Sequence, residues 1–326
     1  MTRYLGDAHR GTPRLEAELA ELIVEMGTAA KALAREIRRA ALVGRLGLVG
    51  EKNPTGDAQK KLDVYSNDVV VSAFEDTGLV AAIVSEELEQ LRVVSCASAA
   101  RYILCVDPLD GSSNTDVNGS VGSIFSFYRR SAEGDCTDVE TEFAGGAELA
   151  AAGYVMYGPS TIMVFSHGDG ANGFTLDHDV GEFILSHEAI QCPPRGPYFS
   201  ANLGNYHAWS DDLRGFVDDL IAGGPATGRP CSLRYTGALV ADLHRNLLEG
   251  GIYLYPPDEN HPRGKLRLLY ECAPMAFIAE QAGGRATDGA DRVLDLTPAS
   301  IHQTTPLFIG SREMLDSFER RAARGG

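Results

Sequence analysis

The chain contains 326 residues, of which 44% are hydrophobic, so it can bury the core of two domains or of one large α/β unit. Its formal net charge of -16 repels the phosphates of nucleic acids and of anionic membranes, and neither is expected as a partner. The six cysteines form no C-x-x-C pair, and no run of about 18 apolar residues is present. These features favour free thiols, a cytoplasmic location and no membrane segment.

The first 76 residues predict two helices separated by a loop. Residues 1–14 are polar and include a proline, which predicts an arm without regular structure. Apolar residues recur at helical spacing over 15–41, and a second helix is expected over 64–76. The intervening segment 44–56 is rich in glycine and is therefore expected to be a loop.

Two short apolar runs, 81–85 and 102–106, predict buried strands, and acidic residues follow each of them. Ligands of open α/β sheets bind at the carboxyl ends of the strands. The acidic residues are therefore expected to lie at a ligand-binding edge of the sheet.

The rest of the chain predicts further strands, a boundary, and then alternating helices and strands. Around 191–197 the composition shifts to proline and glycine, which predicts an N-terminal domain over 1–192 and a C-terminal domain over 193–326. Before this boundary a polar connection is expected over 131–148, with strands at 123–130, 151–157, 161–166 and 173–176. After the boundary we expect a strand or turn at 233–235, a strand at 251–255, and helices at 211–222, 237–248 and 273–282. This pattern predicts an α/β fold.

The strongest chemical signal is the segment Asp107-Pro108-Leu109-Asp110-Gly111-Ser112-Ser113-Asn114. Its two carboxylates, three residues apart, leave a predicted strand and enter a Gly-Ser turn. Mg²⁺ prefers oxygen ligands, which the two aspartates and the Leu109 carbonyl would supply. The backbone N–H groups of the turn could bind a phosphate. For an isolated D-x-x-D pair the alternative is a turn with solvated carboxylates.

Two further acidic segments lie upstream. Glu86 and Glu87 directly follow the predicted strand 81–85, and burying two adjacent carboxylates there requires cations. Without that strand, such a pair is typical of a solvated helix start. The stretch 53–63 contains Asp57 and Asp63 and predicts a mobile loop whose carboxylates could orient or deprotonate a water molecule. The alternative for this stretch is a solvated turn.

Together these segments resemble the class I fructose-1,6-bisphosphatases, in the superfamily that includes the inositol monophosphatases. The resemblance covers roughly residues 15–315. Its most specific parts are D-P-L-D-G-S-S-N and the later segment K-L-R-L-L-Y-E-C, which begins at Lys265 and includes Glu271. It implies an α/β fold with the layered α-β-α-β-α architecture of that superfamily.

The resemblance also implies a role for each matched residue. The implied metal ligands are Glu86, Asp107, the carbonyl of Leu109, Asp110 and Glu271, joined by Asp57 when its loop closes. Asp63 and Glu87 are implied to activate the attacking water. The residues implied to face the 1-phosphate are Asp110, Gly111, Ser112 and Ser113. Those implied to hold the sugar and the 6-phosphate are Asn202, Tyr235, Tyr253, Tyr255, Lys265, Arg267 and, from a neighbouring subunit, Arg234. Taken singly, these tyrosines are typical of a strand core and the basic residues of a solvated strand face.

The implied activity is Mg²⁺-dependent hydrolysis of D-fructose 1,6-bisphosphate to fructose 6-phosphate and phosphate, in gluconeogenesis or the Calvin cycle. The resemblance implies two or three Mg²⁺ per subunit, with Mn²⁺ as a substitute, in a homotetramer or at least a dimer. A sedoheptulose-1,7-bisphosphatase or a broad sugar bisphosphatase is the alternative that one sequence does not separate. An inactive sugar-phosphate-binding paralogue is disfavoured because every implied metal carboxylate is present.

Regulation by AMP is expected to be weak. AMP-inhibited animal members carry a Thr-Gly-Glu-Leu-Thr type of segment near the N-terminus, whereas this chain has Gly11-Thr12-Pro13-Arg14-Leu15. Proline removes a backbone donor that a phosphate at a helix N-terminus would use. Arg101, Tyr102 and Arg129 nevertheless match further AMP contacts of the family.

Overall fold

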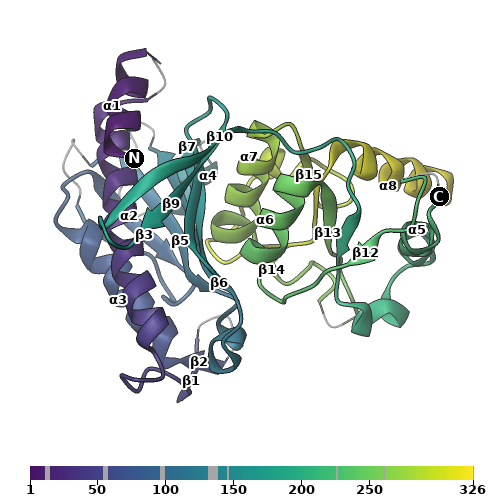
Figure 1. The fold of residues 1–326 in the computed structure, drawn as a ribbon, viewed down its shortest axis with the longest axis horizontal. Helices are drawn as coiled ribbons and strands as arrows, with labels where there is room; N and C mark the ends of the chain where they lie inside the picture. Colours follow the sequence, from purple (N-terminus) through teal and green to yellow (C-terminus); the bar gives the residue numbers. More distant parts are fainter. Residues whose placement is uncertain are drawn as a thin grey trace.

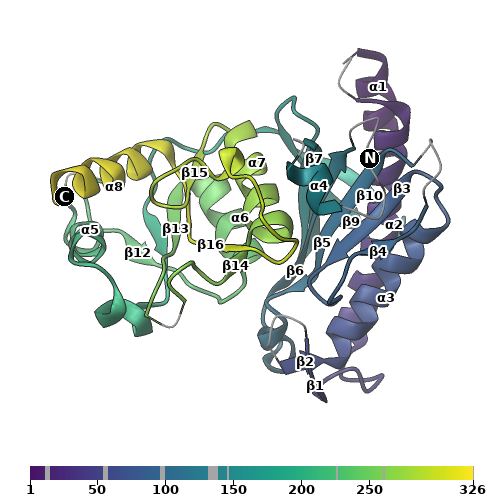
Figure 2. The ribbon, with the colours of Figure 1, turned by 180° about the vertical axis from the view of Figure 1, so that it is seen from behind.

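The computed structural model describes residues 1–11, 15–53, 58–95, 100–130, 139–144, 147–224, 227–259 and 261–325. Its elements form two halves side by side, each built on its own sheet (Figure 1 and, from behind, Figure 2). Helices lie on the outer side of each sheet, and α6 and α7 lie between the two sheets. This order of layers confirms the predicted α-β-α-β-α architecture.

The N-terminal half contains a mixed sheet of eight strands in the order β10-β9-β8-β7-β6-β5-β3-β4, and a small antiparallel pair, β1-β2. Helices α2 and α3 cover the outer face of the large sheet. The elements of this half are α1 (Thr2–Gly11), α2 (Ala17–Arg39), β1 (Leu48–Lys52), β2 (Ala58–Lys60), α3 (Lys61–Glu75), β3 (Val80–Ser85), β4 (Arg92–Val93), β5 (Tyr102–Asp110), the 3-10 helix η1 (Ser112–Val117), β6 (Val121–Arg129), α4 (Val139–Ala144), β7 (Glu148–Tyr157), β8 (Thr161–Ser166), β9 (Ala171–Asp177) and β10 (Glu182–Ile190).

The C-terminal half contains a five-stranded sheet in the order β12-β11-β13-β17-β15, with α6 and α7 on one face and α8 with α5 on the other. Its elements are β11 (Tyr198–Ser200), the 3-10 helix η2 (Leu203–Ala208), α5 (Asp211–Ala222), β12 (Ser232–Leu233), α6 (Leu239–Glu249), β13 (Gly251–Tyr255), β14 (Leu266–Arg267), the π-helical turn η3 (Leu268–Cys272), α7 (Ala273–Gln281), β15 (Arg285–Thr287), the 3-10 helix η4 (Val293–Asp295), β16 (Thr304–Thr305), β17 (Leu307–Gly310) and α8 (Arg312–Gly325).

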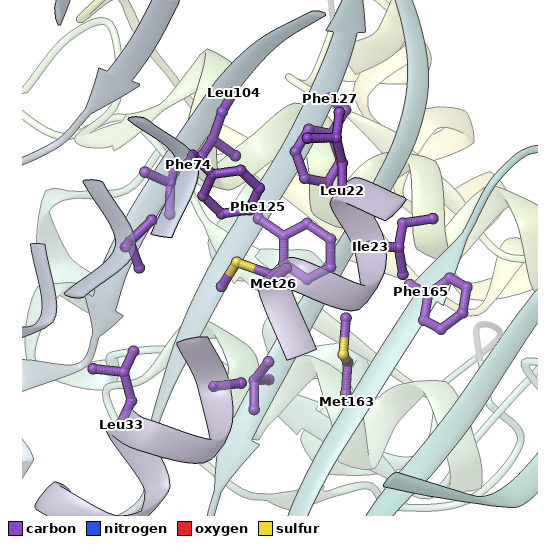
Figure 3. Packing of buried hydrophobic residues seen from close by; sticks show 14 of the residues in the cluster. Leu22, Ile23, Met26, Leu33, Phe74, Leu104, Phe125, Phe127, Met163 and Phe165 are labelled. Atoms are coloured by element: carbon purple, nitrogen blue, oxygen red, sulfur yellow. The ribbon is translucent and has the colours of Figure 1, made fainter. Parts of the chain in front are cut away.

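Two of the hydrophobic cores pack helices against the large sheet. In the first, α2 directs an apolar stripe that includes Leu22, Ile23 and Met26 against Phe125 and Phe165 of the large sheet (Figure 3). The second core lies between the two sheets and is formed mainly by α6 and α7. Helix α7 has the sequence A-P-M-A-F-I-A-E-Q and is apolar around most of its circumference, because it packs against both sheets.

The structure confirms the helices expected from periodicity. Each of the helices α2, α3, α5, α6 and α7 begins and ends within three residues of its predicted limits. Strong amphipathic or fully apolar patterns were sufficient at these places, since burial follows the spacing of apolar residues along a helix. In the described part of the chain, no helix combines the length and apolarity that crossing a membrane requires.

Three expectations for the polar segments were wrong. The expected arm over 1–14 contains helix α1, which is anchored because Leu5 is buried and the ring of Tyr4 packs edge-on against Phe174. The expected loop over 44–56 contains strand β1, and the polar connection 131–148 contains helix α4. Few side chains in these segments are apolar, so their composition does not reveal structure that tertiary contacts stabilise.

Candidate active site

The acidic end of the sheet is created by two neighbouring parallel strands. All the residues of β3 and β5 are buried, and the pairing of Ser85 with Val106 brings their carboxyl ends together. Glu86 follows β3 directly, and its backbone N–H donates to the carbonyl of Val106 at 3.2 Å. The carboxylates that follow the two strands are therefore placed at one edge, as the sequence predicts.

Strand β5 is longer than predicted and carries both aspartates. The strand was expected to end at residue 106, but it continues to Asp110, with an irregular register against β6 between Asp107 and Asp110. The N–H of Leu109 donates to Asp107 Oδ1 at 3.0 Å within this irregular stretch. The expectation that both aspartates follow the strand was wrong, since they belong to β5 and the turn begins only at Gly111. In a regular strand, residues three apart point to opposite faces of the sheet. The interruption of the ladder lets both carboxylates lie on the same side.

Three of the predicted metal ligands converge. One carboxylate oxygen from each of Asp107, Asp110 and Glu271 lies within 4.8 Å of the others, and all three side chains are buried. Glu271 comes from the π-helical turn η3, and its Oε2 accepts a hydrogen bond from the N–H of Arg267 at 2.6 Å. A single π turn is a frequent feature of functional sites, because it shifts the direction of the side chains around it.

The electrostatics of this acidic cluster fit a divalent cation. Burial raises the pKa of Asp107 and of Glu271 well above the ordinary range, and the neighbouring carboxylate of Glu86 raises both further. Burial likewise raises the pKa of Asp110 to about 6. Several carboxylates that repel one another in a buried place are costly unless a cation neutralises them, and their oxygens are the ligands that hard cations prefer. The donor set present in this cluster therefore fits a metal ion.

Asp110 also joins the two halves of the molecule. Its Oδ1 and Oδ2 accept hydrogen bonds from the backbone N–H groups of Leu239, at 3.2 Å, and Val240, at 2.8 Å. These donors belong to the free N–H groups in the first turn of α6, where a carboxylate is favoured by the helix dipole. The orientation of α6 is thus tied directly to the acidic end of β5.

The predicted water-activating carboxylates occupy the neighbouring wall. Asp63 is buried in the first turn of α3, where Oδ2 accepts a hydrogen bond from the N–H of Lys60 at 2.7 Å. Burial raises the pKa of Asp63, and the hydrogen bonds from Lys60 and Ser112 oppose this rise. Glu87 Oε2 accepts from the side-chain amide of Gln59 at 2.6 Å. Asp57 lies outside the described residues.

The turn after β5 depends on a glycine. Gly111 has a φ of 74°, in the left-handed region that favours glycine, and a Cβ built there would lie 2.4 Å from the Cβ of Ala238. The close approach of Ala238 leaves no space for a side chain. Ser112 and Ser113 then open the short 3-10 helix η1. The turn is therefore held between β5 and the segment that leads into α6.

A cavity of about 410 Å³ connects these groups with the C-terminal half. The residues from the predicted site that line it are Asp63, Glu86, Glu87, Asp107, Leu109, Asp110, Gly111, Ser112, Ser113, Tyr235, Tyr253, Tyr255, Lys265, Arg267 and Glu271. Carboxylates and the Gly-Ser turn form one side, and tyrosines with two basic residues form the other. Such a cavity can hold a small molecule with a polar, anionic group at each end.

Two predicted contacts lie away from the cavity wall. Asn202 is exposed and caps the 3-10 helix η2, where its Oδ1 accepts from the N–H of Gly204 at 3.0 Å. The guanidinium of Arg234 is exposed and lies 5.4 Å from the centre of the Tyr198 ring. Neither residue lines the cavity in this single chain.

Sequence reasoning missed several residues of the site. Lys60 lines the cavity with its side chain largely buried, and Nζ forms an ion pair with Asp116 at 2.9 Å. Gln59 contacts Glu87, whereas Asn53, Gly237 and Leu239 also line the cavity. The available signal was the carboxylate of Asp63 three residues after Lys60, a spacing at which an acidic side chain at a helix start can accept a hydrogen bond from the backbone N–H of the preceding cap residue.

The residues that match AMP contacts of the family already contact a carboxylate of this chain. Glu16 Oε2 accepts a hydrogen bond from the hydroxyl of Tyr102 at 3.0 Å and lies 3.0 Å from Arg101 Nη2. Glu16 Oε1 lies 3.2 Å from Arg129 Nη2. A negative group thus already neutralises the two arginines at the start of α2.

Comparison with known proteins identifies relatives along the whole chain. Two family models match, described as the fructose-1-6-bisphosphatase N-terminal domain, over residues 1–188, and the C-terminal domain, over 192–323. A class 1 fructose-1,6-bisphosphatase of Acaryochloris marina is 54% identical, with 94% of this chain and 92% of the relative covered. One of Chlorobium luteolum is 48% identical, with 95% and 93% covered. The crystal structure of Leishmania major fructose-1,6-bisphosphatase in holo form superimposes with a TM-score of 0.92 at 38% identity, covering 99% of this chain and 98% of that one.

Proposed function

This chain belongs to the fructose-1,6-bisphosphatase family, and we infer that it is a phosphoric monoester hydrolase that converts fructose 1,6-bisphosphate to fructose 6-phosphate and phosphate. The observation that carries this function is the convergence of Asp107, Asp110 and Glu271 beside the Gly111 turn, in a cavity whose far wall is basic and aromatic. A bisphosphorylated sugar needs such a pair of anion-binding ends. The carboxylates by themselves indicate only the superfamily, which also includes the inositol monophosphatases.

The family is metal-dependent, and Mg²⁺ is the ion proposed here. Glu86, Asp107, Asp110, Glu271 and the carbonyl of Leu109 would hold two or three ions, with Asp57 contributing when its loop closes and Mn²⁺ as a substitute. When bound, such ions neutralise the phosphoryl oxygens and lower the pKa of bound water. The protein's own contribution is a buried set of oxygens whose positions are fixed before substrate arrives.

The remaining roles divide between water and sugar. We propose that Asp63 and Glu87 orient and accept a proton from the attacking water, because both carboxylates line the cavity next to the acidic cluster. The Gly111–Ser113 turn would hold the reacting phosphate. The other end of the substrate would be held by Tyr235, Tyr253, Tyr255, Lys265 and Arg267, with Asn202 and a neighbouring subunit's Arg234 as outer contacts.

A panel of phosphate esters tests the function. We expect phosphate release from fructose 1,6-bisphosphate to exceed release from inositol 1-phosphate by at least about 100-fold in kcat/KM, because the basic wall contacts only a substrate with a second phosphate. Sedoheptulose 1,7-bisphosphate belongs in the same panel as the competing substrate. A clear preference for inositol 1-phosphate would exclude the proposed activity.

Activity should depend on a divalent cation. Dialysis against a chelator should abolish phosphate release, and Mg²⁺ or Mn²⁺ should restore it, because the buried carboxylates repel both one another and an anionic substrate when no cation is bound. The measurement is the initial rate before and after chelation. Hydrolysis that continues at full rate in the metal-free protein would show that the acidic cluster has another role.

Three further proposals concern the location, the assembly and the domain boundary of the protein. We propose a cytoplasmic enzyme that assembles as a homotetramer, with a boundary near residue 192 between a metal-binding N-terminal domain and a sugar-binding C-terminal domain. The two family models meet in this region, at residues 188 and 192, and each half has its own sheet. Sedimentation of the purified chain tests the assembly.

AMP should inhibit this protein weakly. Beside the altered N-terminal segment, Glu16 already occupies the cationic groups of Arg101 and Arg129, so a nucleotide phosphate would have to displace it. We expect half-inhibition at least about tenfold above a micromolar concentration, which corresponds to about 1.4 kcal/mol of binding free energy. An inhibition titration at low Mg²⁺ measures this, and low micromolar potency in the wild type would contradict it.

The variant Glu16→Ala separates the two causes of weak inhibition. It should make AMP more potent, because the arginines lose their internal carboxylate, whereas Glu148→Ala should have a smaller effect, since Glu148 is mostly exposed and, among the described residues, pairs with Arg129 and not with Arg101. Unchanged potency in Glu16→Ala would mean that the altered N-terminal segment, and not this carboxylate, limits binding.

A further inference from the structure

A buried carboxylate on α6 lies outside the set of residues used above. Asp242 is in the first turn of α6, and its side chain is fully buried. It does not line the 410 Å³ cavity and is not part of the acidic cluster. A buried ionised group is costly unless it is fully hydrogen-bonded, so its retention in this place requires a partner network.

The hydrogen bonds of Asp242 are directed to the segment that precedes its helix. Oδ2 accepts from the backbone N–H of Thr236 at 2.8 Å and from the Thr236 hydroxyl at 3.0 Å. Oδ1 accepts from Arg245 Nη1 at 3.1 Å. Both oxygens are therefore engaged by donors, and the side chain holds the turn 236–238 against the start of α6.

The same turn is fastened on its other side to the phosphate turn. The side-chain amide of Asn114 donates to the carbonyl of Thr236 at 3.0 Å and to that of Ser120 at 3.1 Å. The N–H of Asn114 donates in turn to the carbonyl of Gly111 at 2.8 Å. A continuous set of hydrogen bonds thus runs from Asp242 through Thr236 and Asn114 to the turn that we propose for the reacting phosphate.

The residues next to Thr236 line the cavity. Tyr235 and Gly237 both contribute to its wall. Ala238 packs so closely against Gly111 that a Cβ added to Gly111 would lie only 2.4 Å from the Cβ of Ala238. The position of Thr236 consequently sets the distance between the sugar side and the phosphate side of the site. A substrate that contacts both sides binds tightly only when this distance is held in advance, because a site that must first be ordered loses binding free energy.

We propose that Asp242 is a positioning residue for substrate binding, which fixes the turn 235–238 relative to the Gly111 turn through Thr236 and Asn114. The proposal rests on the proposed function for its kinetic consequence only. Asp242 touches neither the substrate nor the acidic cluster in this account. Its effect is to hold Tyr235 on one wall and the phosphate turn on the other at a fixed separation.

Four substitutions separate the hydrogen bonds to the turn from the charge of the carboxylate. Asp242→Leu has a similar volume but accepts no hydrogen bond, and it should raise KM for fructose 1,6-bisphosphate by at least about tenfold with a smaller change in kcat. Asp242→Asn keeps an acceptor for Thr236 and should stay within about threefold of wild type. Thr236→Val should raise KM to an intermediate degree. Arg245→Met removes only the partner of Oδ1 and should leave KM unchanged.

The control for a general loss of a paired aspartate is Asp316→Asn on α8, because the carboxylate of Asp316 pairs with Arg285 of β15, away from the site. Thermal unfolding identifies any variant that fails to fold, and Thr236→Val then decides the matter if Asp242→Leu does not fold. A folded Asp242→Leu or Thr236→Val with wild-type KM would overturn the proposal. An equal rise of KM in Arg245→Met would also overturn it, because the charge pair would then be responsible.

Amide hydrogen exchange tests the positioning role without any turnover. In Asp242→Leu the amide of Thr236 should exchange at least about tenfold faster than in the wild type, because its acceptor is lost. Unchanged protection would overturn the proposal even for an active enzyme. Absence of phosphate release from the wild type would instead count against the proposed function, and the exchange experiment would still decide whether Asp242 orders the turn.

Discussion

Asp107→Asn and Glu271→Gln should each reduce phosphate release by about a thousandfold and at the same time raise the melting temperature of the metal-free protein. Activity falls because a ligand that stabilises charge in the transition state is lost. Stability rises because a neutral amide of the same size is less costly to bury and removes repulsion among the carboxylates; burial first, and this repulsion second, raise the pKa of Asp107 and Glu271. Phosphate-release assays at saturating Mg²⁺ and thermal unfolding without metal measure the two effects.

The opposite signs of these effects distinguish a metal site from a structural acidic cluster. Mg²⁺ should raise the melting temperature of the wild type more than that of Asp107→Asn, because only the wild type has the complete ligand set. Asp316→Asn is the matched control, since its carboxylate pairs with Arg285 and lies outside the cavity. Full turnover by Asp107→Asn at saturating metal would remove Asp107 from the proposed ligands.

Gly111→Ala should reduce phosphate release by about 100-fold or more. The new Cβ would lie 2.4 Å from the Cβ of Ala238, so either the phosphate turn or the start of α6 has to move. The φ of 74° adds a backbone cost of about 1–2 kcal/mol for a residue with a side chain. Because Asp110 is hydrogen-bonded to α6 next to this contact, the displacement also reaches the acidic cluster. Steady-state kinetics and thermal unfolding measure both consequences.

The control for Gly111→Ala is Gly228→Ala, at a glycine whose φ of 69° is close to that of Gly111. This variant therefore has the backbone cost without the collision with Ala238, and its activity should stay close to that of the wild type. If the two variants lose activity equally, the contact between Gly111 and Ala238 does not position the phosphate turn.

The sequence by itself determined the elements whose burial is encoded in local spacing. The apolar stripe of α2 and the nearly all-apolar α7 predict their helices, because the side chains that pack recur at the period of the backbone. The apolar runs before Glu86 and Asp107 likewise predict strands that deliver acidic groups to one edge. The resemblance implied a role for each of these residues. The paired carboxylates before a Gly-Ser turn indicated a metal and phosphate site without it.

Only the tertiary structure decided which distant segments meet. Glu271 joins Asp107 and Asp110 because η3 and α7 pack against the large sheet, and nothing local in the chain specifies that neighbour. The same holds for α6, whose first N–H groups reach Asp110, and for Glu16, whose carboxylate pairs with Arg101 just before β5 and with Arg129 at the end of β6. Polar side chains of this kind leave no periodic signal, since their partners are chosen by the packing of whole layers. Local sequence therefore determined the elements that carry the site residues. The apolar layer of α6 and α7 between the two sheets determined how these elements come together.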